Sequence, residues 1–160
     1  MKVIAELGLP QVIITREFAA PRELLFRAYT EPELLARWLG PDSLTLTVNQ
    51  LDVRHGGRWR WTHYDADGKG YVFHGLYHGT PSPERIVQTY EFGERPGHVY
   101  LNTITFEEHD GTTTLRQNTV FQTVEERDDY VRADMETGIR ASMAKLDDLV
   151  TRLAKEARHA

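Results

Sequence analysis

One long amphipathic segment near the C-terminus, from Glu136 to Glu156, constrains this chain more than any other feature. Apolar residues recur there at gaps of four and three, which is the period of one face of an α-helix. They are Ile139, Met143, Leu146, Val150 and Leu153. A helix of this length with a single apolar stripe must pack against another surface. Because most of the preceding chain has the pattern of β-strands, we expect that surface to be a sheet.

The segments between Ser43 and Phe121 show the two-residue alternation of β-strands. Short turn sequences such as Asp67-Gly68 separate them. Connections this short favour an antiparallel meander, because parallel strands need long crossovers. The predicted strands are Leu44–Asp52, Arg58–Tyr64, Gly70–Gly79, Ile86–Phe92, Val99–Glu107 and Thr112–Phe121.

The N-terminal part predicts one strand followed by two short helices. Val12–Phe18 alternates between apolar and polar residues, and Arg22–Tyr29 has an apolar helical face after a proline. Thr30 and Glu33 form a capping-box pattern at the start of a second short helix, which Gly40-Pro41 ends.

A second capping-box pattern, Thr123 to Glu126, opens a short helix that runs to about Arg132. We expect Gly138 to kink or separate that helix from the long one. The chain shows no repeat, low-complexity tract or linker. We therefore expect residues 11–158 to form a single domain. We expect residues 1–10 to be a loosely attached lead-in to it.

Composition excludes several functional classes. The chain of 160 residues has a net charge of -5, which argues against nonspecific binding to nucleic acid or to an acidic membrane surface. It contains no cysteine, so disulfides, thiol catalysis and thiolate metal sites are excluded. No apolar run is long enough to cross a membrane and no signal-peptide pattern is present, so we expect a cytoplasmic protein.

Aromatic residues fall on positions that should face the interior. In Arg58–Tyr64 the inward positions are Trp59, Trp61 and His63, because alternate side chains of a strand share one face. The two tryptophans either fill core volume or form the wall of an apolar ligand pocket. The same two interpretations apply to Trp38, at the end of the second short helix.

Polar residues also fall on inward positions of the later strands. Gln88 and Tyr90 share one strand, Asn102 lies on the next and Gln117 on the last. Buried polar groups must find partners or water. These residues therefore hydrogen-bond to one another, or reach solvent through a shift of register, or orient a ligand in a partly polar cavity.

Histidine is the residue type to consider for catalysis, and His63 is the one expected to lie inward beside the tryptophans. The sequence places no carboxylate to orient it. His74 and His78 share a strand face but lie about 13 Å apart at the usual rise of a strand, too far for one metal ion. We assign no catalytic residue, no metal ligand and no cofactor.

The chain also carries a series of motifs in a specific order. They are Thr15–Pro21, Leu25–Ala28, Thr30–Pro32, Trp38–Pro41, Asp52–Trp59, Gly75–Tyr77, Pro83–Thr89 and Phe106–Leu115, followed by the segment Gly138–Leu146. In this order they resemble the heat-shock-protein-ninety ATPase-activator-like family, over about residues 11 to 155.

This resemblance implies the α+β helix-grip fold of the START-like (SRPBCC) superfamily. There, a strongly bent antiparallel sheet wraps a long C-terminal helix, and two short helices follow the first strand. The element order inferred from the residues agrees. The superfamily commonly encloses a cavity for hydrophobic small molecules, and some branches are enzymes. The co-chaperone role belongs to relatives with a separate N-terminal domain, so we expect a stand-alone C-terminal-type domain without a chaperone interaction.

We therefore expect a protein that binds a small hydrophobic molecule between the long helix and the sheet, rather than an enzyme. One alternative is a cyclase- or hydrolase-like enzyme that uses His63 with Tyr90 or Asn102 in the same cavity. Another is an interaction module that acts on a chaperone or a partner subunit and binds no ligand. The sequence leaves the ligand's identity and a homodimer open. The predicted ligand-binding residues are Trp38, Trp59, Trp61, His63, Gln88, Tyr90, Asn102, Gln117, Met135, Arg140 and Met143.

Overall fold

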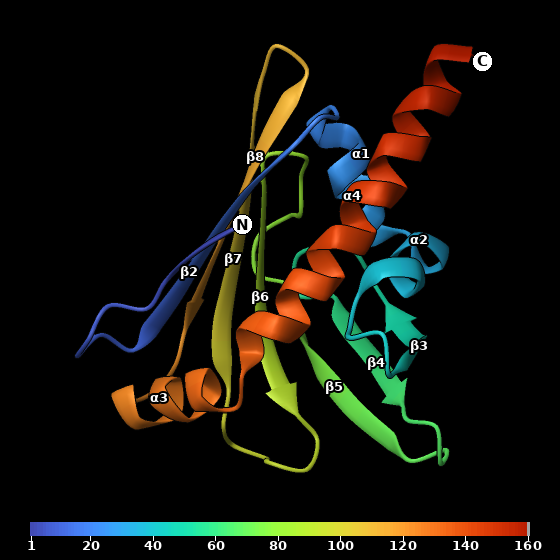
Figure 1. Cartoon of the computed structure of the whole chain (residues 1–160). Helices are drawn as coiled ribbons and strands as arrows, with labels where there is room; N and C mark the ends of the chain where they lie inside the picture. Colours follow the sequence, from blue (N-terminus) through green and yellow to red (C-terminus); the bar gives the residue numbers. More distant parts are fainter. Residues whose placement is uncertain (160) are drawn as a thin grey trace.

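A computed structural model describes residues 1–159 as one antiparallel sheet of eight strands with a long C-terminal helix lying across it (Figure 1). The strand order is β1-β2-β8-β7-β6-β5-β4-β3. The predicted α+β helix-grip fold is confirmed. The strands are β1 (Lys2–Ile4), β2 (Gln11–Phe18), β3 (Thr45–Leu51), β4 (Arg58–Tyr64), β5 (Gly70–Leu76), β6 (Arg85–Phe92), β7 (Tyr100–His109) and β8 (Thr112–Val120). The helices are α1 (Arg22–Thr30), α2 (Pro32–Trp38), α3 (Val124–Arg132) and α4 (Met135–His159).

The N-terminal segment is fastened to the sheet, so the prediction of a loose lead-in is wrong. Strand β1 pairs antiparallel with β2, where Lys2 faces Thr15. The buried guanidinium of Arg127, on α3, donates a hydrogen bond to the carbonyl oxygen of Glu6 at 2.8 Å. A three-residue strand is too short to show the alternation on which a prediction depends.

The predicted capping box at Thr30 is also wrong. Thr30 is the last residue of α1, and its hydroxyl donates to the carbonyl oxygen of Phe26 at 2.7 Å. Helix α2 instead begins after Glu31, whose side chain makes no capping hydrogen bond, with Pro32 in the first turn. The threonine bonds back into the preceding helix, a known competitor of N-capping.

The break between α3 and α4 lies at Asp134 rather than at Gly138. Asp134 has a φ of 57°, in the left-handed region, whereas Gly138 lies inside the continuous helix α4. The other capping prediction is confirmed, because the Thr123 side chain accepts a hydrogen bond from the backbone N–H of Glu126 at 3.1 Å.

Helix α4 lays its apolar stripe against the inner face of the sheet, which we define as the face toward α4 (Figure 1). Met143, Leu146, Leu149 and Val150 are buried there. Helices α1 and α2 both contact α4. Within residues 1–159, no helix is both long and apolar enough to cross a membrane.

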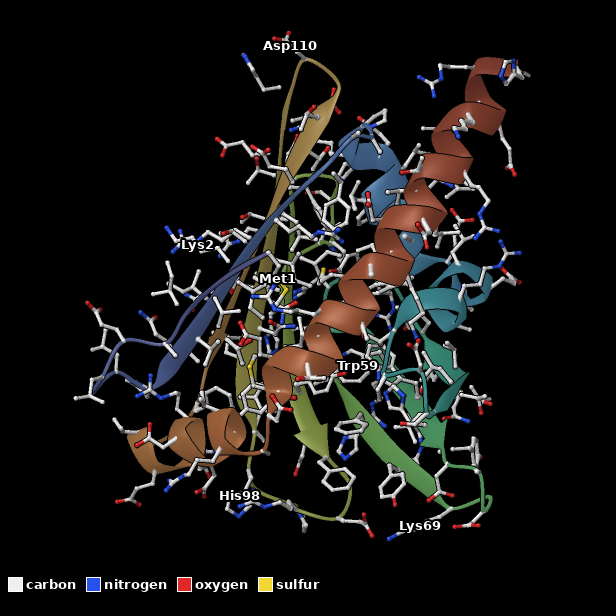
Figure 2. All side chains as sticks on the ribbon, in the orientation of Figure 1. Met1, Lys2, Trp59, Lys69, His98 and Asp110 are labelled. Atoms are coloured by element: carbon white, nitrogen blue, oxygen red, sulfur yellow. The ribbon has the colours of Figure 1, made fainter. Side chains whose placement is uncertain are left out.

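The register of the sheet decides which side chains lie beneath α4. On β4, Trp59, Trp61 and His63 are buried while Arg58 and Arg60 are exposed, as the alternation predicts. Figure 2 labels Trp59 where α4 crosses the strands near β4 and β5.

Three more strands present an ordered polar row on the same inner face. Gln88 on β6 lies opposite Asn102 on β7, which lies opposite Thr119 on β8. All three are buried. The sheet therefore offers α4 an aromatic region from β4 and a polar region from β6 to β8.

Candidate functional site

A cavity of about 320 Å³ lies between α4 and the inner face of the sheet, with α1 and α2 along its side. Small-molecule sites commonly enclose roughly 300–1,000 Å³, so this cavity has the size of a small-ligand pocket. Strands β4 to β8 and all four helices contribute to its wall. The space between helix and sheet is therefore not filled by side chains.

Most of the predicted ligand-binding residues line this cavity. They are Trp38, Trp61, His63, Gln88, Tyr90, Asn102, Gln117, Met135 and Met143. Their convergence follows from the strand alternation and from the helical period of α4.

Two predicted residues lie elsewhere. Trp59 is 1% exposed and stacks on Trp61 with ring centroids 4.0 Å apart, so it supports the cavity wall from behind. Arg140 lies on the solvent side of α4, where it pairs with Glu136 at 2.9 Å. One helical step of about 100° separates Arg140 from Ile139, which does line the cavity.

His63 is a buried polar side chain of the cavity wall. It is 7% exposed, and its Nδ1 atom is buried without a hydrogen-bond partner among residues 1–159. The ring meets Phe73 edge-on, with centroids 5.5 Å apart. Burial and, to a smaller extent, the positive charge of Lys145 together lower the pKa of His63 to about 4. His63 is therefore neutral at physiological pH.

Gly40 holds His63 in place from the loop after α2. A β-carbon on Gly40 would lie 2.7 Å from Cε1 and 2.8 Å from Nδ1 of His63, so the ring packs directly on the glycine backbone. Gly40 also has a φ of 104°, which other residues rarely adopt.

Two residues of α4 fix the peptide groups of Gly40. The Gly40 N–H donates to Oγ of Ser142 at 2.9 Å, and Nζ of Lys145 donates to the Gly40 carbonyl oxygen at 2.7 Å. Lys145 also pairs with Asp42 at 3.5 Å. Neither of these α4 residues is predicted from the sequence, because neither lies on the apolar stripe that predicts the helix.

Four tyrosines line the cavity: Tyr29, Tyr90, Tyr100 and Tyr130. The rings of Tyr90 and Tyr100 stack with centroids 5.1 Å apart. Burial raises the pKa of Tyr130 to about 12 and raises the pKa of each of the other three further above the usual phenol range. All four phenols are therefore neutral at physiological pH. Of these, only Tyr90 was predicted as a site residue.

The hydrogen bonds within the cavity wall determine which polar atoms remain available to bind a ligand. Nε1 of Trp61 donates to the hydroxyl oxygen of Tyr90 at 3.2 Å, so the Tyr90 hydroxyl hydrogen remains available as a donor. Thr119 donates to Oδ1 of Asn102 at 3.2 Å. The hydroxyl of Tyr29 is buried without a partner in the described part of the chain.

The cavity wall formed by residues 1–159 contains no aspartate, glutamate, lysine or arginine. In the same part of the chain, no three histidine or carboxylate side chains come together in a way that could hold a metal ion. The wall is thus aromatic and aliphatic, with neutral hydrogen-bonding groups set into it.

Comparison with known proteins adds a family and a set of similar folds. The model of the Activator of Hsp90 ATPase homolog 1-like protein family matches residues 19–151. A search of curated proteins finds no match.

Several solved structures resemble this chain over nearly its whole length. Protein Ms6760 from Mycobacterium smegmatis is 26% identical, with a TM-score of 0.83, and the match covers 94% of this chain and 96% of that one. A Rhodobacter sphaeroides protein is 24% identical, with a TM-score of 0.86 and coverage of 95% and 99%. The AHSA1 protein from Silicibacter pomeroyi is 23% identical, with a TM-score of 0.71 and coverage of 91% and 99%. The last two likenesses show the fold alone.

Proposed function

Because this chain belongs to the family of Activator of Hsp90 ATPase homolog 1-like proteins, we propose that it acts as a small-molecule binding protein on that scaffold. The molecule bound is small and mainly apolar, and it occupies the cavity between α4 and the sheet. A chaperone interaction is not part of this proposal.

The observation that carries the proposal is an open cavity of about 320 Å³ at the centre of the fold. Protein interiors normally pack as densely as organic crystals and leave few voids larger than a water molecule. Apolar walls with a few placed polar groups are the usual composition of a ligand site. Trp61, Phe73 and Ile139 supply such apolar surface here.

Unpartnered polar atoms in the wall give further support. The Tyr29 hydroxyl and Nδ1 of His63 are both buried without partners in the described part of the chain. Leaving such a group unsatisfied costs about 1–3 kcal/mol. A wall built for packing alone gains nothing from these groups, so we attribute them to a binding role.

Binding fits the titration behaviour of the wall better than acid–base catalysis does. A general acid or base works best with a pKa near the working pH. The pKa of His63 is lowered to about 4 by burial, and burial raises that of Tyr90 well above the usual phenol range. Because no carboxylate of residues 1–159 lies in the wall to orient His63, we favour binding over the cyclase- or hydrolase-like alternative.

Native mass spectrometry of the purified protein tests this proposal. We expect a bound small molecule that is released on denaturation, and its loss in a Gly138→Leu variant. Gly138 lines the cavity, and a β-carbon there would meet no atom within 4 Å, so the larger side chain of leucine is expected to extend into the cavity. Arg140→Leu adds a similar side chain on the solvent side of α4 and should retain the molecule.

The same pair of variants should differ in a thermal-shift screen of neutral apolar compounds. We expect stabilisation of the wild type and of Arg140→Leu but not of Gly138→Leu. No mass excess together with no stabilising compound, or equal stabilisation of all three proteins, would contradict the proposed function.

A further inference from the structure

We propose that the cavity selects an uncharged, flat molecule whose hydrogen-bond acceptor, such as a carbonyl oxygen, is bound by Nε2–H of His63 and the hydroxyl of Tyr90. This inference rests on the proposed function and specifies the chemistry of its ligand. It assigns His63 and Tyr90 as the polar anchor of the site.

The packing of His63 decides which nitrogen meets the ligand. Its Cε1–Nδ1 edge is sealed against Gly40, because a β-carbon on that glycine would lie 2.7–2.8 Å from those two atoms but 4.0 Å from Nε2. Among residues 1–159, Nδ1 has no hydrogen-bond partner, and it is buried from water. His63 nevertheless lines the cavity. Of the two ring nitrogens, Nε2 is therefore the one left to meet a ligand.

The same packing assigns the proton of the neutral ring. One nitrogen of a neutral imidazole carries a hydrogen and the other is an acceptor. A hydrogen on Nδ1 would point toward Gly40, where no acceptor of residues 1–159 receives it. The proton is better placed on Nε2, where it becomes a donor into the cavity.

Tyr90 supplies a second donor. Its oxygen already accepts a hydrogen bond from Nε1 of Trp61, so its own hydrogen is directed elsewhere. The ring of Phe73 packs on both residues, with its centroid 5.5 Å from that of His63 and 5.6 Å from that of Tyr90. Two donors on one aromatic wall favour a ligand that presents an acceptor.

The charges around the site disfavour an ionised ligand. No aspartate, glutamate, lysine or arginine among residues 1–159 lines the cavity. The nearby cation, Lys145, is engaged by the Gly40 carbonyl oxygen and by Asp42. A carboxylate or ammonium group buried without a counter-charge carries a desolvation penalty of several kcal/mol. A neutral group avoids that penalty.

The shape of the wall favours a flat ligand. Trp61, Phe73, Tyr90 and Tyr100 all line the cavity, and Tyr90 stacks on Tyr100 at 15° between the ring planes. Aromatic rings pack well against planar partners in offset-stacked or edge-on arrangements.

Three matched probes test the inference by isothermal titration calorimetry: 2-acetylnaphthalene, 2-ethylnaphthalene and 2-naphthoate. They share one ring system and differ in having a neutral acceptor, no acceptor or a negative charge. We expect the acetyl compound to bind roughly three- to tenfold more tightly than the ethyl compound, the worth of a net hydrogen bond. We expect the naphthoate to bind more weakly than either.

Two histidine variants identify the anchoring nitrogen. The amide nitrogen of glutamine reaches the position of Nε2, whereas that of asparagine reaches only the position of Nδ1. His63→Gln should therefore keep the preference for the acetyl compound, and His63→Asn and Tyr90→Phe should reduce it. If a variant binds 2-ethylnaphthalene with unchanged affinity, its cavity is intact.

The outcomes separate this inference from the proposed function. Equal affinity for the acetyl and ethyl compounds, tightest binding of the naphthoate, or an unchanged preference in His63→Asn would overturn the inference while cavity binding stands. Failure of all three probes, including the ethyl compound, would overturn both.

Discussion

The imidazole ring of His63 and the backbone of Gly40 are packed so closely that no β-carbon fits between them. Such a carbon would lie 2.7 Å from Cε1 of the ring. This contact joins the loop after α2 to strand β4. Ser142 holds the same glycine from α4, so one peptide unit connects three separate parts of the cavity wall.

Replacing Gly40 with alanine should destabilise the protein by about 2–3 kcal/mol, because the positive φ alone costs about 1–3 kcal/mol and the new methyl group also displaces His63. Urea unfolding measures the change. Gly138→Ala is the matched control, and it should stabilise α4 by about 0.4–1 kcal/mol since open space surrounds that position. Equal effects of the two substitutions would show that the Gly40–His63 contact is unimportant.

Ser142→Ala should leave the Gly40 N–H buried without an acceptor, at a cost of about 1–3 kcal/mol. Hydrogen exchange of the Gly40 amide should also become faster. Ser43→Ala, at an exposed position of the same loop, should change the unfolding free energy by no more than about 0.5 kcal/mol. Unchanged protection of the Gly40 amide in Ser142→Ala would contradict the role given to Ser142.

Strand alternation was sufficient to predict most of the sheet side of the site. Gln88, Asn102 and Gln117 were placed inward because side chains two residues apart share one face, and the register of β6, β7 and β8 brings them together. The period of α4 likewise predicted Met135 and Met143.

Contacts made by loops could not be predicted in this way. The hydrogen bond between Gly40 and Ser142 joins residues 102 positions apart. Nothing in the local sequence pattern around Ser142 or Lys145 indicates where the loop after α2 will lie. Arg140 is among the predicted ligand-binding residues, but it lies on the solvent side of α4, where it pairs with Glu136. Trp59 was correctly placed inward, yet only the three-dimensional packing shows Trp61 covering it.

His63 should make the protein less stable in mild acid. Its pKa is lowered by burial from 6.5 in the unfolded chain to about 4 in the folded protein. Between these values the unfolded state binds more protons, so stability is fully present above about pH 6.5 and is lost as the pH falls toward 4. The charged or titratable neighbours are Lys145 on α4, Asp42 paired with it, and Tyr71 opposite His63 on β5.

Urea unfolding at about pH 7 and about pH 5 measures this effect. The wild type should lose about 2 kcal/mol more than His63→Asn over that interval, because only the wild type has a buried histidine to protonate. An identical loss in the two proteins would contradict the assignment of the lowered pKa to His63.

Trp59 and Trp61 should separate stability from binding. Trp61→Phe removes the hydrogen bond to Tyr90 and alters the cavity wall, so it should weaken binding of 2-acetylnaphthalene. Trp59→Phe leaves the wall in place but loosens the packing behind it, and should cost about 1–3 kcal/mol of stability with little change in affinity. Calorimetry measures the affinity and urea unfolding the stability. Weaker binding by Trp59→Phe, together with unchanged affinity in Trp61→Phe, would show that Trp59 is the ligand contact.

The most direct test of cavity binding uses the three methionines of the chain as reporters. Met135 and Met143 line the cavity, whereas Met1 packs against the core outside it. In methyl NMR spectra of protein labelled with ¹³C-methyl methionine, titration with 2-acetylnaphthalene should shift the Met135 and Met143 signals saturably and leave the Met1 signal in place. Unmoved Met135 and Met143 signals, or equal shifts of all three, would contradict binding in the cavity between α4 and the sheet.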